Sequence, residues 1–228
     1  MLRKQFLLIC SLAGLLEVQA AVEYTFTYEN INTAIPELNP SGLTDARSVS
    51  ADPGLTIVDV DVSLTISGTG FGGFSGDLFV TLEHETGYAV LLNRPGSRDG
   101  FPSGYSDGAG FDVTFDDAAP ADVHSYRLTL NGDETVPISG PLTGFWSPDA
   151  RNVDPLLVSA SSPRTAFLNS FNGLALDGEW SLLISDRSAG GTHQLDSWSL
   201  HVQTVPEPTV TATGLLFSLV LFLSRRRK

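Results

Sequence analysis

The sequence has 228 residues and a formal net charge of −13, a length that suits one domain with short end segments. Between residues 21 and 204, seven arginines and no lysine stand against 24 Asp and Glu residues, a formal charge of −17. This charge argues against nucleic acid as a partner, because phosphate binding requires positive charge. The only cysteine is Cys10, so we expect the body to fold without disulfides.

Residues 1–20 have the pattern of a secretory signal peptide. Arg3 and Lys4 precede an apolar run over residues 6–16, and Val18 and Ala20 occupy the third and first positions before the expected cut. The apolar run is shorter than the roughly 20 residues of a spanning helix. We therefore predict export, with signal peptidase cleaving between Ala20 and Ala21.

Alternation of apolar and polar residues predicts strands along the body. In residues 57–66, IVDVDVSLTI, Val58, Val60, Val62, Leu64 and Ile66 share one face of the predicted strand. Shorter runs of the same kind occupy residues 22–30, 77–84, 88–92, 111–115, 124–130, 179–185 and 195–202. Residues 32–54 are rich in turn-forming types and are predicted to be mostly loop, and residues 68–73 a glycine-rich loop between two antiparallel strands.

Many short strands with turn residues between them predict an all-β fold for residues 21–204, a jelly-roll β-sandwich. No amphipathic helix is expected before residue 209. Trp180 and Trp198 lie in alternating strand patterns and are expected in the core, whereas Trp146 is the freest of the three tryptophans and a candidate platform for a sugar.

Residues 205–228 differ in kind from the body. Pro206 and Pro208 lack the backbone donor that a strand needs, so we expect the domain to end near Thr204. The apolar residues 210–224 would reach roughly 22 Å as a helix, short of a hydrocarbon core of about 30 Å. The sequence predicts one short C-terminal transmembrane helix, with a cytoplasmic basic end made of Arg225, Arg226, Arg227 and Lys228.

The tetrapeptide Val205-Pro206-Glu207-Pro208, the apolar segment and the basic end follow one another at the end of the chain. Together they resemble the PEP-CTERM sorting signal of Gram-negative bacteria. The resemblance implies that an exosortase, a membrane-embedded cysteine protease, removes the tail during delivery to the cell surface or to an exopolysaccharide matrix. A permanent anchor in the inner membrane is the alternative.

No motif in the sequence predicts an enzyme. Gly68-Thr-Gly70-Phe-Gly-Gly73 has the spacing G-x-G-x-x-G, but a predicted strand follows it, where a dinucleotide site needs a helix. No serine lies in a nucleophile elbow. The four histidines lack the close spacing of a zinc site.

Aspartates cluster at predicted strand ends. Asp77 opens one strand, and Asp116 and Asp117 close another. Carboxylate oxygens in such loops suit Ca²⁺, so these three residues form a candidate calcium site. The alternative is that they cap turns, for which Asp is favoured without any metal.

Several motifs occur in a fixed order within residues 34–203: IPE at 35–37, IVDVDV at 57–62, GDLFVTL at 76–82, FDDA at 115–118, FNG at 171–173, DGEWSL at 177–182, ISD at 184–186 and LDSWSL at 195–200. In this order they resemble the P domain, or P/Homo B domain, of proprotein convertases and bacterial subtilisin-like proteases. The resemblance implies a jelly-roll β-sandwich. The catalytic domain of those proteases has no counterpart here, so we expect no endopeptidase activity.

The sequence therefore predicts an exported, non-catalytic module at the cell envelope or in the extracellular matrix of a Gram-negative bacterium, with a structural or adhesive role. An exopolysaccharide or envelope component would be its partner. Two alternatives stay open: regulation of a separate subtilisin-like protease in trans, and carbohydrate binding.

Both ends of the chain are expected to be removed, because both have the pattern of targeting signals. The mature protein should begin at Ala21 and lack Arg225–Lys228. Intact-mass analysis of surface-derived protein checks this. Retention of the basic cluster in that material would instead indicate a permanent anchor.

Overall fold

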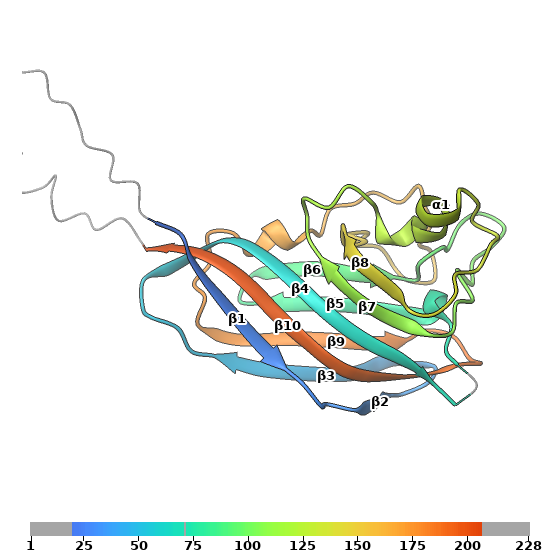
Figure 1. Ribbon diagram of the computed structural model, residues 1–228, viewed down its shortest axis with the longest axis horizontal. Coiled ribbons are helices and arrows are strands. Elements are labelled where there is room, and N and C mark those ends of the chain that lie inside the picture. Colours follow the sequence, from blue (N-terminus) through green and yellow to red (C-terminus); the bar gives the residue numbers. More distant parts are fainter. Residues whose placement is uncertain (1–19, 71, 207–228) are drawn as a thin grey trace, which may run out of the picture.

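Two β-sheets packed face to face make up the structure, a computed structural model that describes residues 20–70 and 72–206 (Figure 1). The first sheet has the order β1-β10-β4-β7-β8, with β2 beside β10, and the second has the order β3-β9-β5-β6. The strands are β1 (Val22–Tyr28), β2 (Thr33–Ile35), β3 (Asn39–Val49), β4 (Leu55–Thr69), β5 (Leu78–His84), β6 (Gly87–Asn93), β7 (Gly110–Phe115), β8 (Leu142–Trp146), β9 (Gly178–Asp186) and β10 (Thr192–Pro206).

The chain passes repeatedly from one sheet to the other (Figure 1). When the short β2 and β8 are left aside, the first sheet holds the first, eighth, third and sixth strands, and the second sheet the second, seventh, fourth and fifth. The paired strands run antiparallel, except β7 and β8, which are parallel. The predicted all-β sandwich is confirmed.

Inward-facing side chains of both sheets form the core. Trp180 of β9 and Trp198 of β10 are at most 1% exposed, which confirms their predicted burial. His84 stacks on Trp180 with ring centroids 4.2 Å apart, and its two ring nitrogens lie 2.9 and 2.8 Å from the carbonyl oxygens of Glu179 and Ala175. In either neutral tautomer the single ring N–H can donate to one of these carbonyls, which satisfies that donor within the core.

Trp146 is the most exposed of the three tryptophans, as predicted, but it is still buried and offers no platform for a sugar. Trp146 is 4% exposed, and its indole Nε1 donates to the carbonyl of Thr143. Its neighbour on β8, Phe145, is 68% exposed. Successive side chains of a strand point to opposite faces, and only the position of β8 against the core decides which of the two aromatic rings is buried.

The segment predicted as mostly loop contains the eleven-residue strand β3. β3 is an edge strand paired with β9 alone, and its register shifts between Asn39 and Leu43, where Gly42 has a φ of +57°. Edge strands tolerate proline, glycine and charged residues, since one side of the strand needs no ladder hydrogen bonds. The strand β3 was therefore missed because its composition is typical of a loop.

Other predicted elements also differ. Residues 124–130 were predicted as a strand, but residues 126–131 form the helix α1 (Tyr126–Asn131), which is capped by Gly132 with a φ of +69°. The glycine-rich loop connects β4 and β5, which lie in different sheets and do not pair. Val58 is 38% exposed and not inward-facing, because the register of β4 against β10 shifts between Ile57 and Asp59.

Strand β10 continues two residues beyond the expected boundary at Thr204. Val205 pairs with Thr56 and Pro206 with Leu55 of β4, whereas β1 on the other side begins opposite Thr204. The missing donor of Pro206 is tolerated because no strand flanks it on that side. The predicted signal peptide, the rest of the sorting motif from Glu207 onward and the predicted C-terminal helix lie outside the described residues. Within residues 20–206, no helix is long and apolar enough to cross a membrane.

Buried ion pairs hold the long connections onto the sandwich. Asp107 accepts from Arg127 at 2.8 and 2.9 Å and from the Tyr126 hydroxyl, so it ties α1 to the loop before β7. Asp149 lies 2.7 Å from the His124 Nδ1 and 3.1 Å from an Arg151 nitrogen. Both of these buried aspartates have direct basic partners, which offset the cost of burying their charge.

The adjacent aromatic residues of β8 provide a test of this packing. Trp146→Ala should lower the free energy of unfolding by about 3–5 kcal/mol, because it leaves a cavity in the core. Phe145→Ala should change it by less than about 0.5 kcal/mol, as an exposed substitution does. Urea unfolding of both variants measures this, and equal losses would contradict the assigned orientation of β8.

Candidate functional site

The outer face of the first sheet carries a polar groove of about 400 Å³. The strand register places Thr25 of β1 beside His201 of β10, and His201 beside Asp61 of β4. A second row lies two residues further along the same three strands and consists of Glu23, Gln203 and Asp59. The full lining is Glu23, Tyr24, Thr25, Asp59, Asp61, Ser63, Thr114, Phe145, His201, Val202 and Gln203.

His201 is the centre of the hydrogen-bonding groups in the groove. Its Nε2 lies 3.1 Å from the hydroxyls of both Ser63 and Ser199, and its Nδ1 lies 3.3 Å from the hydroxyl of Thr25. The Ser63 hydroxyl also lies 2.9 Å from that of Thr114. Four strands therefore present hydroxyl groups and one imidazole on a single surface.

An exposed aromatic ring lies beside these polar groups. Phe145 of β8 pairs in register with Thr114, which pairs with Ser63. Its ring is 68% exposed and has no place in the core. Tyr24, at the other edge of the groove, instead packs its half-buried side chain against the core. The groove therefore combines hydrogen-bonding groups with an apolar surface that a ligand could cover.

Carboxylates repel one another at one end of the groove. Burial, followed by the charges of Asp116, Asp59 and Asp117, raises the pKa of Asp61 to about 6. Burial and the charge of Asp116 also raise the pKa of Asp59. One oxygen of Asp61 is buried without a hydrogen-bond partner. The charge on Asp61 is thus unfavourable in the folded protein.

The three residues of the predicted calcium site are not brought together. Asp116 and Asp117 follow β7 beside Asp59 and Asp61. Asp77 lies beside Asp186 and His193, and His193 pairs with Gly68 of β4. The end of β7 pairs with Val62 of β4, six residues before Gly68. At 3.3 Å per residue, this separates the two places by roughly 20 Å.

The roles of Asp116 and Asp117 follow the capping alternative. Asp117 accepts from the backbone amides of Leu168 and Asn169 at 3.1 and 2.8 Å, at the start of the 3-10 helix η3 (Leu168–Phe171). Asp116 accepts from the amide of Ala118 at 2.6 Å. Over residues 20–206, apart from residue 71, no three His, Cys, Asp or Glu residues are grouped to hold a metal ion. Calcium stays a prediction that rests on the acidity of the body and not on this set of three.

Neither His201 nor His124 is placed as the base of a serine triad. The Nε2 of His201 lies beside the hydroxyls of Ser63 and Ser199, but its Nδ1 faces the hydroxyl of Thr25. In a serine triad, a carboxylate holds this second ring nitrogen. His124 does contact a carboxylate, that of Asp149, but its other nitrogen lies 2.8 Å from the carbonyl of Ser97. In the described part of the chain, no serine hydroxyl contacts a histidine that is oriented by a carboxylate.

Two solved structures show a limited similarity to this chain. They are the crystal structure of the Aeromonas sobria serine protease in complex with the chaperone ORF2, with a TM-score of 0.45 and 15% identity over 82% of this chain, and the crystal structure of the Aeromonas sobria serine protease, with a TM-score of 0.44 and 16% identity over 81%. The match covers 27% of each of those chains. At this level of similarity, nothing about the function of this chain follows from theirs.

No family model and no curated protein matches the sequence. The resemblances to the P domain and to the PEP-CTERM signal therefore stay predictions.

Most groove residues were missed at the sequence level. Ser63, Thr114, His201 and Gln203 are polar members of alternating strands, a pattern that indicates a solvent-facing surface but not which strands are neighbours. The alternation of IVDVDVSLTI does place Asp61 and Ser63 on the polar face. No sequence pattern predicted that Phe145 is exposed.

The raised pKa of Asp61 predicts a pH-dependent stability difference. A carboxyl whose folded pKa of about 6 lies above its usual value near 4 destabilises the fold above pH 6, and the penalty disappears as the pH falls from 6 to 4. Asp61→Asn should therefore stabilise the protein at pH 8 by about 1 kcal/mol, after allowance for solvent screening, and have little effect at pH 4. Urea unfolding at both values measures this, with Asp52→Asn on the exposed surface as the charge-matched control. A variant less stable than the wild type at pH 8 would contradict the assignment.

Proposed function

We propose that residues 21–204 form an exported, non-catalytic jelly-roll module of the P-domain type, which binds an extracellular glycan in the polar groove of the first sheet. The single observation that carries glycan binding is the combination of clustered hydroxyls, carboxylates and an imidazole with the exposed ring of Phe145. The strand order of the two sheets supports the jelly roll, which consists of eight strands in two Greek keys.

The chemistry of the groove suits a sugar chain. Sugars present many hydroxyls, which both donate and accept, and carboxylates such as Asp59 and Asp61 would accept charge-assisted hydrogen bonds from them. The apolar face of a sugar ring would cover Phe145, which is otherwise in water. A neutral glycan avoids further repulsion in a groove where the carboxylates already repel one another.

The end segments support a location outside the cytoplasm. The signal-peptide pattern of residues 1–20 and the PEP-CTERM-like residues 205–228 are the features of a protein sorted to the envelope or to an exopolysaccharide matrix. An adhesive function in that matrix would account for both the targeting signals and the groove. Exosortase and signal peptidase would be its processing partners.

Regulation of a protease in trans has weaker support. The resemblance to the P domain includes Trp180, Leu182, Trp198 and Leu200, all of which are buried in the core. Buried residues indicate a shared fold and not a shared contact surface. The exposed groove residues are therefore the better guide to a partner.

Glycan screening followed by calorimetry tests the proposal. The purified body should bind a subset of neutral polysaccharide fragments, and Phe145→Ala should weaken that binding about tenfold, equivalent to about 1.4 kcal/mol. Leu157→Ala removes a side chain that is 77% exposed and outside the groove, so it should bind as the wild type does. Equal affinity of the Phe145 variant and the wild type would rule out the groove as the site, whereas recovery of a subtilisin-like protease in a pull-down would favour the alternative.

A further inference from the structure

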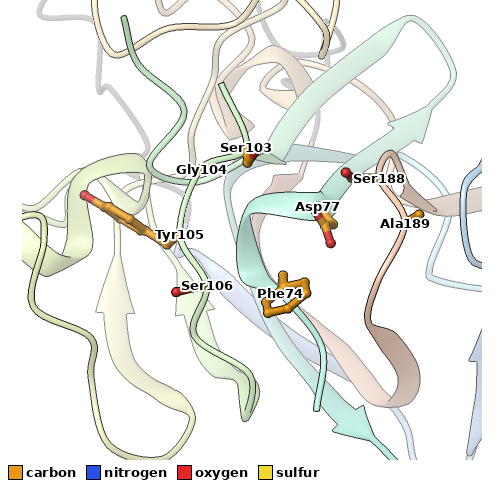
Figure 2. A pocket seen from close by; sticks show the side chains of 8 residues that line it. All are labelled: Phe74, Asp77, Ser103, Gly104, Tyr105, Ser106, Ser188 and Ala189. Carbon is orange, nitrogen blue, oxygen red and sulfur yellow. The ribbon is translucent and has the colours of Figure 1, made fainter. Parts of the chain in front are cut away.

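A second cavity, of about 230 Å³, lies away from the groove at the start of β5 (Figure 2). Three segments form it: residues 74–77, which include the 3-10 helix η1 (Ser75–Asp77), the loop 103–106, and the turn at Ser188 and Ala189 between β9 and β10. Phe74 and Asp77 point into the space between the two loops, whereas the Tyr105 ring points away from it (Figure 2).

Asp77 is a buried carboxylate that no group of the described residues satisfies. The residue is 3% exposed, its side chain makes no hydrogen bond, and its Oδ2 is buried without a partner. Among the described residues, no basic group lies within 4 Å of it, whereas the other buried aspartates, Asp107, Asp149 and Asp186, each have one. An unpaired buried carboxylate costs folding free energy, so a bound cation would stabilise Asp77.

The neighbouring groups do not supply that cation. Burial and the charge of Asp186 raise the pKa of Asp77 to about 6, and Glu37 adds to this, while Arg94 and His193 only partly oppose them. Arg94 directs its Nε to the carbonyl of Gly76 at 2.9 Å. The Nδ1 of His193 lies 3.4 Å from Asp186, and Asp186 accepts from the amide of Ser188 at 3.0 Å.

Glycines in and next to the residue 74–77 segment lie in close contact with neighbouring segments. A Cβ on Gly76 would lie 2.3 Å from the carbonyl oxygen of Ser103, and a Cβ on Gly73 would lie 2.1 Å from the Nε2 of His193. The amide of Gly76 donates to the carbonyl of Tyr105 at 2.8 Å. The cavity is therefore preformed, which reduces the entropy lost when a ligand binds.

We propose that this cavity binds an organic cation, a guanidinium or alkylammonium group, with Asp77 as its counter-ion and Phe74 as its aromatic wall. The volume equals that of roughly eight water molecules at ~30 Å³ each, enough for a guanidinium with its methylene groups. A cation beside the half-exposed ring of Phe74 gains a cation–π interaction in addition to the ion pair. The hydroxyl groups of Ser103, Ser106 and Ser188 belong to lining residues that can accept its remaining hydrogen bonds.

An organic cation fits better than a metal ion. Ca²⁺ takes six to eight oxygen ligands, whereas Asp77 is the only carboxylate that lines the cavity, and the described residues contain no group of three metal-binding side chains. A guanidinium needs only one carboxylate and a few acceptors. Such a cation could be a free small molecule or the side chain of a basic peptide, and the chain itself carries Arg225–Lys228.

Titrations followed by amide NMR signals of residues 74–77 and 188–189 test the proposal. At pH 8, argininamide should bind at least tenfold more tightly than citrullinamide, which has nearly the same shape and no charge on its side chain. A peptide with the sequence SRRRK, matching residues 224–228, shows the source: tighter binding than argininamide indicates a basic peptide, and equal binding a small cation.

Variants connect the binding to Asp77. Asp77→Asn should weaken argininamide binding at least tenfold, whereas Asp52→Asn, an exposed change of the same charge, should leave it unaltered. Phe74→Ala should weaken it several-fold and serves as the second variant if the Asn variant fails to fold. Binding should also weaken from pH 8 to pH 5, because Asp77, with a pKa of about 6, becomes protonated.

Three results would overturn the proposal. The first is equal binding of argininamide and citrullinamide, and the second is unaltered binding in both the Asp77 and the Phe74 variants. The third is tight binding of Ca²⁺, but not of argininamide, at the same amide signals, which would make the cavity a metal site.

Discussion

The long antiparallel ladder between β10 and β4 is the interaction on which the rest of the structure depends. It runs from Thr192 opposite Thr69 to Pro206 opposite Leu55, along the middle of the first sheet. β10 also pairs with β1 and β2, so it holds the N-terminal part of the described chain against the sandwich. Alternate residues of β10, such as Trp198 and Leu200, point into the core. The residues that alternate with them, such as His201, point to the groove.

This position of β10 links core and surface chemistry. Near its start, His193 packs against Gly73 and lies beside Asp186 in the neighbourhood of the Asp77 cavity. Towards its end, His201 and Gln203 line the groove. One strand thus supplies residues of the groove and, roughly 20 Å away, a residue next to the Asp77 cavity. A shift of its register by one residue would exchange the core and solvent faces.

Charge is the second constraint on the molecule. The body has a formal charge of −17 and no cysteine in residues 21–204, so the apolar core must outweigh considerable self-repulsion without a disulfide. Most buried aspartates are neutralised by arginine or histidine, as Asp107 and Asp149 are. Asp61 and Asp77 are exceptions, and their pKa values are raised to about 6. We infer ligand sites where the fold keeps such unfavourable carboxylates next to a cavity.

The sequence by itself determined the all-β class, the burial of Trp180 and Trp198, and the polar face that carries Asp61, because side-chain alternation along a strand is a local property. It did not reveal β3, whose edge position allowed turn-type residues, nor α1, whose six residues carry no clear period. Only the tertiary structure decided that Phe145 is exposed and Trp146 buried, that Asp77 lies far from Asp116 and Asp117, and that His201 and Asp61 are neighbours. These facts depend on which strands pair and in which register, and pairing joins residues more than a hundred positions apart that no local pattern connects.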